Sequence, residues 1–315
     1  MSHLEMREVF ASRLKEMMAG DERIVLINAD LARAGGTQGL SAAFPGRCFN
    51  VGVAEANMVS VASGMASCGY VPFISSFAPF ATRRVCDQLA ISVCYAKQPV
   101  KVIGTDPGIS AELNGGTHMG VEDIGVIRSL KGMVIFEPVD ARQLSQSMQQ
   151  IVDHPGPVYI RLHRKKTEDV FGADYRFDLF KADVIKEGRD VSILATGLMV
   201  QESMEALALL KQAGVDAELI NVHTIKPIDR ETIIRSAKKT GCVVTAENHS
   251  TIGGLYSAAA EVLSAQCPTL MAAIGIDDMF GEVGMMPYLK ERFRLRGEDI
   301  AGACLKIIEK KEQSK

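Results

Sequence analysis

Short apolar runs alternate with helical patterns along the first half of the chain. Consecutive apolar residues are typical of strands covered on both faces of a sheet, and they occur at 23–28, 71–75, 100–104, 133–136 and 157–161. Apolar residues at helical spacing precede the first run, at 6–18, and lie between later runs, at 80–96 and 140–152. The alternation predicts a parallel sheet with crossover helices, in a first domain that covers residues 1–165.

A polar, charged passage follows, and then the pattern restarts. We place a domain boundary near Lys165 and a linker at 166–189. Predicted strands resume at 191–195, 217–222 and 242–246, with helices over 200–208, 229–237 and 299–310 and another that begins after Gly253-Gly254. The fold class is therefore α/β, with two parallel-sheet domains, of which the second, residues 190–315, is smaller.

An acidic residue stands at an unusual place in the first domain. Glu55 follows a short apolar run at 48–53 and precedes a helix with an apolar face formed by Met58, Val61, Ala62 and Met65. Ligands bind at the carboxyl ends of strands in open α/β sheets, and an acid in the first helical turn also suits the helix dipole. Glu55 is thus a candidate site residue, although the local pattern alone favours a plain helix-start carboxylate.

Three further features lie near the same predicted edge of the sheet. Phe77 and Phe80 follow a predicted strand, although aromatic residues at helical spacing more often belong to a core. A long Gly-rich loop carries His118, a candidate proton-transfer group, although a lone loop histidine more often has no such role. Arg161 and Arg164 are candidates to meet an anionic group, with a solvated linker charge as the comparable alternative.

Composition excludes several classes of protein. The 315 residues carry a net charge of -3, with no basic run of the kind that binds nucleic acid. No apolar stretch approaches the ~20 residues that a membrane span needs. The seven cysteines are scattered, so neither a disulfide framework nor a zinc site is indicated. The first residues contain no apolar signal-peptide region, so we expect a soluble, cytoplasmic protein.

Together these motifs resemble those of the transketolase family, in order and spacing and over nearly the whole chain. The segments that carry the resemblance are Asn50-Val-Gly-Val-Ala-Glu55-Ala-Asn-Met-Val, Ser76-Phe-Ala-Pro-Phe80, Gly116-Thr-His118 with Glu122-Asp123, Ile225-Lys-Pro-Ile-Asp229, and Ala246-Glu-Asn-His249 with Gly253-Gly254. The chain resembles the carboxyl-terminal half of a transketolase, which comprises the pyrimidine-binding domain and the C-terminal domain, as found in split two-subunit members. We expect a structural or interface role for the last of these segments.

The resemblance implies thiamine diphosphate chemistry, in which a two-carbon ketol unit passes from a ketose to an aldose. The position that matches Glu55 hydrogen-bonds the pyrimidine ring nitrogen and so supports proton removal from the thiazolium carbon. Phe77 and Phe80 match the aromatic wall that packs on the aminopyrimidine. His118 matches a histidine that meets the substrate's oxygens, so the implied catalytic residues are Glu55 and His118.

On the substrate side the sequence departs from the family. Asn114 stands where transketolases have an acid, Asp106 where a histidine helps to bind phosphate, and Ala34 where a serine does so. Arg164 matches the family's phosphate-contacting arginine. We therefore expect His118, Asn114, Asp106 and Arg164 to bind a donor that differs from the usual sugar phosphates.

The sequence contains no Gly-Asp-Gly with a downstream Asn, the motif that holds magnesium and diphosphate in this family. We therefore assign no metal ligand to this chain. We expect an N-terminal partner subunit to hold most of the Mg²⁺ and diphosphate, in a heterotetramer. Two alternatives remain open, namely the β subunit of a 2-oxo acid dehydrogenase, with the same glutamate role, and a non-catalytic regulatory paralogue.

Overall fold

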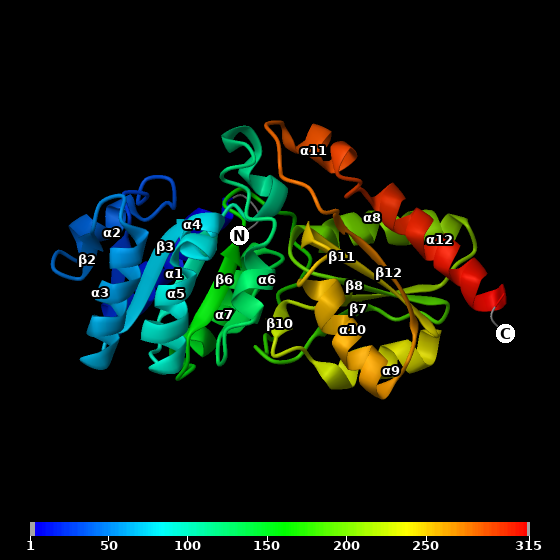
Figure 1. The fold of residues 1–315 in the computed structure, drawn as a ribbon, viewed down its shortest axis with the longest axis horizontal. Helices are drawn as coiled ribbons and strands as arrows, with labels where there is room; N and C mark the ends of the chain where they lie inside the picture. The colour runs from blue at the N-terminus through cyan, green and yellow to red at the C-terminus, as the bar shows by residue number, and fades with distance from the viewer. Residues whose placement is uncertain (1–3, 314–315) are drawn as a thin grey trace.

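Two α/β domains lie side by side in the computed structural model, which describes residues 4–313 (Figure 1). Within these residues, seven strands form one sheet and five form another. Most neighbouring strands are parallel, and each domain also contains one antiparallel pair. The predicted two-domain α/β class is therefore confirmed, with sheets that are mixed rather than purely parallel.

The first sheet contains all five strands predicted for the first domain. Its strands are β1 (Ile24–Asn28), β2 (Cys48–Asn50), β3 (Val71–Phe77), β4 (Lys101–Thr105), β5 (Val134–Phe136), β6 (Val158–Leu162) and β10 (Thr224–Lys226). They lie in the order β10-β5-β6-β4-β3-β1-β2. The short apolar run before Glu55 forms β2, and β10 reaches this sheet from the second half of the chain.

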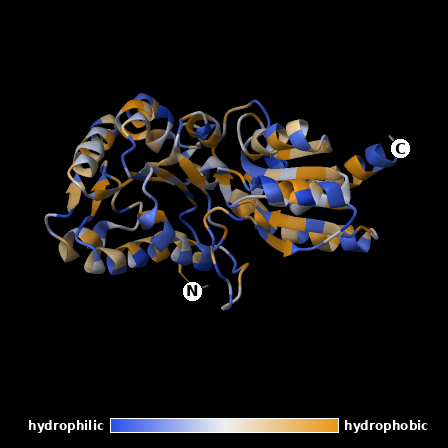
Figure 2. Cartoon of the chain, turned by 90° about the horizontal axis from the view of Figure 1, so that it is seen from below, coloured by the Kyte–Doolittle hydropathy of each residue, from blue (hydrophilic) through white to orange (hydrophobic). Residues whose placement is uncertain are grey.

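Helices cover both faces of this sheet, as its continuous apolar strands require. They are α1 (Met6–Gly20), α2 (Gln38–Ala43), α3 (Glu55–Ser67), α4 (Ala78–Ala81), α5 (Cys86–Gln88), α6 (Asp123–Arg128) and α7 (Ala141–Asp153), with the 3-10 helices η1 (Arg83–Val85) and η3 (Gly108–Asn114) and the π-helix η2 (Leu89–Tyr95). Helices α1 and α7 pack on one face, and α3 and η2 pack on the other. Figure 2 shows helices of this domain in two layers, above and below the strands, with both hydrophobic and hydrophilic residues on them.

The helix predicted over 80–96 is not continuous, so this prediction is wrong in detail. The segment divides into α4, η1, α5 and η2, with the first break at Thr82. The Thr82 hydroxyl donates to the carbonyl of Ala78 at 2.6 Å, and Thr82 has a non-helical ψ of -83°. A threonine side chain that bonds the preceding turn in this way competes with the helical ladder, and here the helix ends.

The second domain follows the predicted alternation and adds two strands that the sequence pattern did not indicate. Its strands are β7 (Asp183–Lys186), β8 (Val191–Ala195), β9 (Ala217–Asn221), β11 (Cys242–Ser250) and β12 (Leu270–Ile276), in the order β12-β11-β8-β9-β7. Its helices are α8 (Leu198–Gln212), α9 (Arg230–Thr240), α10 (Leu255–Gln266), α11 (Met286–Arg292) and α12 (Gly297–Gln313). Strand β7 lies inside the passage predicted as a linker and pairs antiparallel with β9.

A buried arginine joins the two domains. Arg161, on β6, has no exposed side-chain surface; its Nε lies 2.9 Å from Asp123 and its Nη1 2.8 Å from Glu137. Its Nη2 donates to the backbone carbonyl of Asn248, in the second domain, at 2.7 Å. Burial alone would disfavour its charge, but the two carboxylates outweigh burial and raise the pKa of Arg161. The prediction that Arg161 could meet a substrate anion is therefore wrong, because its donors are already used inside the protein.

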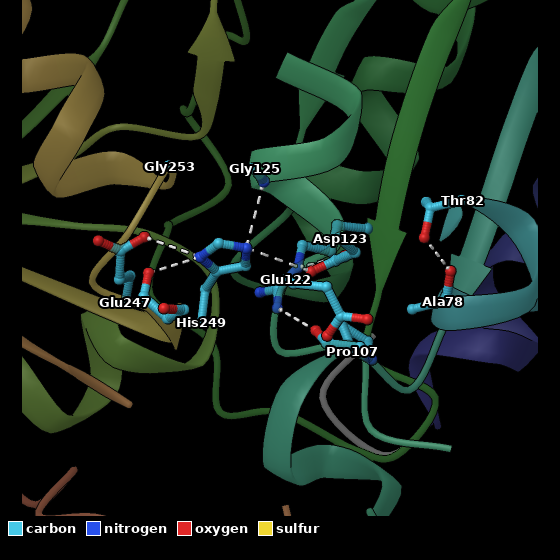
Figure 3. Close-up of polar contacts among 12 residues, drawn as sticks. Ala78, Thr82, Pro107, Glu122, Asp123, Gly125, Glu247, His249 and Gly253 are labelled. Carbon is cyan, nitrogen blue, oxygen red and sulfur yellow. Dashed lines mark hydrogen bonds and ion pairs between the residues drawn. The ribbon is translucent and has the colours of Figure 1, made fainter. Parts of the chain in front are cut away.

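The segment 246–254 lies on the second-domain side of the contact between the two domains, here called the domain seam. His249 accepts the N–H of Gly125 at 3.3 Å through Nε2, and its Nδ1 is 3.6 Å from Glu247 (Figure 3). Glu247 accepts the N–H of Leu255 at 2.6 Å. This segment therefore has the interface role expected for it, since its polar groups connect α6 of the first domain with α10 of the second.

Replacement of Arg161 with methionine should lower the free energy of unfolding by about 3–5 kcal/mol, because Asp123 and Glu137 would stay buried without their counter-charge. Urea unfolding of the purified chain measures the loss. Arg128→Met is the matched control, because Arg128 also crosses the seam but pairs with the exposed Glu261. That control should cost no more than about 1 kcal/mol. Equal losses for the two variants would contradict the role given to Arg161.

Candidate active site

The candidate residues meet at one edge of the first sheet. Glu55 is the first residue of α3, just after β2, whereas Phe77 ends β3 and Phe80 lies in α4. His118 lies in the loop between β4 and α6. Strands β1, β2, β3 and β4 are parallel, so their carboxyl ends share this edge, as the sequence pattern predicts.

The turn before Glu55 is built by short-range hydrogen bonds. Gly52 has φ of 74°, which glycine adopts without a steric penalty, and its N–H donates to Asn50 Oδ1 at 3.0 Å. The same oxygen accepts the N–H of Asp30 at 3.0 Å, which ties the turn to the end of β1. Glu55 follows this turn and is only 4% exposed at the first turn of α3, where the helix dipole favours a negative charge.

Arg84 supplies the counter-charge for Glu55. Its Nη1 lies 2.9 Å from Glu55 Oε1, and its guanidinium carbon lies 3.9 Å from the centroid of the Phe80 ring. A flat cation thus touches an aromatic face and a buried carboxylate at the same time. Sequence reasoning missed Arg84, because its partner Glu55 is 29 positions away and no local pattern indicates the contact.

Phe77, Phe80 and His118 form an aromatic group beside this pair. The His118 ring centroid is 5.5 Å from that of Phe77 and 5.2 Å from that of Phe80, both in edge-on geometry. The two phenyl rings are 6.1 Å apart. His118 Nδ1 also lies 2.9 Å from the hydroxyl of Thr117. The two phenyl rings therefore lie against one side of the imidazole.

A second cluster gathers two arginines near Phe77. The guanidinium carbon of Arg164 lies 5.1 Å from the Phe77 ring centroid, and Arg164 forms an ion pair with Asp106. Arg164 and Arg7 both donate to the carbonyl of Ala34, at 3.3 and 3.2 Å. Burial raises the pKa of Asp106, and Arg164 opposes that shift. Arg7 was missed by the sequence reasoning, because it lies in the first turn of α1 with no motif around it.

The loop that carries His118 is more ordered than its Gly-rich sequence predicts. Residues 108–114 form the 3-10 helix η3, which is interrupted at Glu112 by a non-helical φ of 47° and ends at Asn114. Asn114 has an exposed side chain, whereas His118 is half-buried. The structure thus groups Phe77 with Phe80, His118 and Arg164, while Asn114 stands at the exposed end of η3.

Two negative findings apply to the part of the chain that the structure describes. Residues 4–313 contain no cluster of three or more His, Cys, Asp or Glu side chains able to hold a metal ion. Among the same residues, no helix combines the length and apolar character that crossing a membrane requires.

Both domains match models of known protein families. Residues 2–169 match the family described as "Transketolase, pyrimidine binding domain". Residues 180–300 match "Transketolase, C-terminal domain". The two matches together cover most of the chain and follow each other in the order that the sequence motifs predict.

Individual relatives agree with these matches. The chain is 50% identical to "6-deoxy-6-sulfo-D-fructose transketolase subunit SqwH" of Clostridium sp. (strain MSTE9), over 97% of this chain and 95% of that protein. It is 36% identical to "Putative transketolase C-terminal section" of Methanocaldococcus jannaschii, over 97% of this chain and 96% of that protein. Each of these relatives has nearly the same extent as this chain, so the likeness is to a transketolase half that exists as a separate protein.

Solved structures show the same fold. A structure titled "Split gene transketolase, inactive beta4 tetramer" superposes with a TM-score of 0.88 at 39% identity, and the match covers 97% of this chain and 98% of that one. Transketolase from Leishmania mexicana gives a TM-score of 0.81 at 18% identity, over 98% of this chain and 46% of that one. The chain therefore belongs to the transketolase family, in which it corresponds to the C-terminal subunit of the split, thiamine diphosphate-dependent transketolases.

Proposed function

We propose that this chain and an N-terminal partner subunit together form a cytoplasmic heterotetramer that transfers a two-carbon ketol unit from a ketose to an aldose. The observation that carries the proposal is the juxtaposition of a buried carboxylate, Glu55, with Phe77, Phe80 and His118 at one edge of the first sheet. Relatives named as transketolase subunits, at 50% and 33% identity, favour ketol transfer over the 2-oxo acid dehydrogenase alternative.

The contacts of Arg84 support a pyrimidine-binding role for this edge. Its guanidinium lies on Phe80 and donates to Glu55, so the site accommodates a flat group that carries N–H donors. The aminopyrimidine of thiamine diphosphate is such a group. In this proposal Glu55 holds a proton at the pyrimidine ring nitrogen, and Phe77 and Phe80 pack on the ring. His118 and Asn114 face the substrate's oxygens, and the bound cofactor supplies the electron sink for carbon–carbon bond cleavage.

The partner subunit is proposed to hold the Mg²⁺ and the diphosphate. The sequence contains no Gly-Asp-Gly motif, and residues 4–313 form no cluster of potential metal ligands. The similar split transketolase is described as an inactive β4 tetramer. That description supports, for the present chain, a site completed by the partner rather than the alternative of a non-catalytic paralogue.

The Glu55→Gln variant tests the proposed role of the carboxylate. A glutamine cannot take up or share the proton at the pyrimidine nitrogen, so proton removal from the thiazolium carbon should slow by roughly 10²–10⁴. Deuterium exchange at that carbon, in the reconstituted complex with saturating cofactor, measures the change. A plain helix-start acid would cost only about 0.3–1 kcal/mol of stability and leave exchange unaltered.

The control for this measurement is Glu122→Gln. Glu122 is also an acid paired with an arginine, Arg83, at the start of a helix in the same domain. Exchange in this control should match the wild type. If Glu55→Gln also exchanges at the wild-type rate, Glu55 is a structural residue and the catalytic proposal fails.

Partner dependence is tested by mixing. The chain alone should bind thiamine diphosphate weakly and transfer no ketol units, because half of the cofactor site lies on the other subunit. Addition of the partner should restore binding and turnover, as followed by calorimetry and by a coupled assay. Full activity of the isolated chain, shown by mass spectrometry to be free of partner, would contradict the two-subunit arrangement.

The donor is proposed to be a ketose with a singly charged terminal group, such as a sulfonate. Arg164 already pairs with Asp106, and Arg7 with Glu5, so the cluster beside Phe77 has little unpaired positive charge. Such a cluster neutralises a monoanion better than the dianion of a phosphate ester. The name of the relative at 50% identity, which specifies 6-deoxy-6-sulfo-D-fructose, supports this substrate class.

The Asp106→His variant tests this explanation. It removes the carboxylate that occupies Arg164, so the preference between 6-deoxy-6-sulfo-D-fructose and fructose 6-phosphate should shift toward the phosphate. One charged hydrogen bond is worth about 1.5–3 kcal/mol, which corresponds to a shift of roughly tenfold or more in the ratio of kcat/KM values. A wild-type complex that uses xylulose 5-phosphate more efficiently than the sulfonate would refute the proposed donor.

A further inference from the structure

The second domain holds the loop that carries His118. This loop, residues 106–122, connects β4 to α6 and is here called the His118 loop. Ser250 donates its N–H to the carbonyl of Val121 at 2.7 Å, and Met286 donates its N–H to Glu112 Oε1 at 3.1 Å. Both donors belong to the second domain. The loop is therefore tied to that domain in its middle and at its end.

A side chain of the second domain secures the beginning of the loop. Asn248, on β11, is 1% exposed. Its Oδ1 accepts the N–H of Ile109 at 2.9 Å, and its Nδ2 donates to the carbonyl of Pro107 at 3.1 Å. The side-chain amide of Asn248 thus forms one hydrogen bond as acceptor and one as donor with the backbone of a single short turn, as the backbone of a neighbouring strand would. It satisfies the buried N–H of Ile109, whereas the Pro107 carbonyl also accepts from the N–H and the hydroxyl of Ser110.

The turn at this point has a conformation that needs such support. Asp106 and Gly108 have φ values of 52° and 56°, and Glu112 has φ of 47°. Non-glycine residues in such conformations cost of order 1–3 kcal/mol and persist only where the surroundings determine them. A Cβ at Gly108 would collide with the Asn248 amide, so the loop passes as close to β11 as a glycine allows.

The position of Asn248 is itself fixed from the first domain. Arg161 Nη2 donates to the carbonyl of Asn248 at 2.7 Å, while the other nitrogens of Arg161 bind Asp123 and Glu137. Asn248 therefore lies between a buried, ion-paired arginine and the turn at 107–109. The position of the first turn of the His118 loop therefore depends, through Asn248, on how the two domains meet.

We propose that Asn248 is a positioning residue for ketol transfer, which holds the His118 loop so that His118 stays between Phe77 and Phe80 and faces the substrate. The proposal rests on the proposed function. It gives the second domain a part in catalysis that requires none of its side chains to touch substrate. Displacement of a catalytic group by about 1 Å can lower the rate roughly 10²-fold.

The Asn248→Ala variant should loosen the loop and impair turnover of the donor without affecting cofactor binding. In the reconstituted complex, kcat/KM for the donor should fall roughly 10- to 100-fold, through both kcat and KM. The affinity for thiamine diphosphate should stay at the wild-type value, because Glu55, Phe77 and Phe80 lie on other elements. Hydrogen–deuterium exchange should accelerate at amides 109–121 and not at α3.

Two further variants make the test specific. Arg128→Met weakens the domain seam at Gly253 and Glu261, away from the loop, and should leave loop exchange and kcat/KM unchanged. Gly108→Ala disrupts the same contact from the loop side, because its Cβ would collide with the Asn248 amide. The losses of kcat/KM in Gly108→Ala and Asn248→Ala should therefore be less than additive in the double variant. If Asn248→Ala does not fold, Asn248→Asp keeps the acceptor for Ile109 but opposes the Pro107 carbonyl, and should accelerate the same amides.

Two outcomes would overturn the proposal. One is an unchanged exchange rate at amides 109–121 in the Asn248 variants. The other is a loss of kcat/KM no greater than that of Arg128→Met. A wild-type complex that lacks ketol-transfer activity would count against the proposed function. Because exchange is measured without substrate, the exchange rates would still test whether Asn248 positions the loop.

Discussion

The charge of Arg161 constrains how the two domains meet. An ionised side chain with no exposed surface is tolerated only where every donor has a partner, and these partners come from three places in the fold. Asp123 begins α6, Glu137 follows β5, and the carbonyl of Asn248 belongs to the second domain. Only the bond to Asn248 crosses between the domains, so a rotation of one domain against the other would break it and leave a donor of the buried guanidinium without that partner.

Only part of the site at the sheet edge depends on how the two domains meet. Glu55, Phe77 and Phe80 follow strands of the first sheet and are placed by that sheet and its own helices. His118 lies on a loop tied to the second domain through Val121, Glu112 and the turn at 107–109. The residues proposed to hold the cofactor and the residue proposed to meet the substrate are therefore positioned by different parts of the chain.

Sequence patterns predicted the strands of the first sheet other than β10, and the placement of Glu55, because apolar runs and helix starts are local signals. They also placed Phe77 and Phe80 at the same sheet edge as Glu55, since the carboxyl ends of parallel strands share one edge, but they did not indicate the contact of both rings with His118. They did not indicate the buried role of Arg161, for which the alternatives were an anionic group or a solvated linker charge, or the roles of Arg84 and Asn248. The partners of these three residues lie between 24 and 141 positions away, and no periodicity within one element records such distances.

Strand β10 has a consequence for how such a chain can be divided. It is part of the first sheet through its pairing with β5, yet it lies between β9 and α9 of the second domain. A cut at 166–189 would therefore leave one fragment with an exposed sheet edge along β5 and the other with an unpaired strand. The two domains must therefore stay together if both sheets are to remain intact. This holds for gene fission, for domain exchange and for circular permutation.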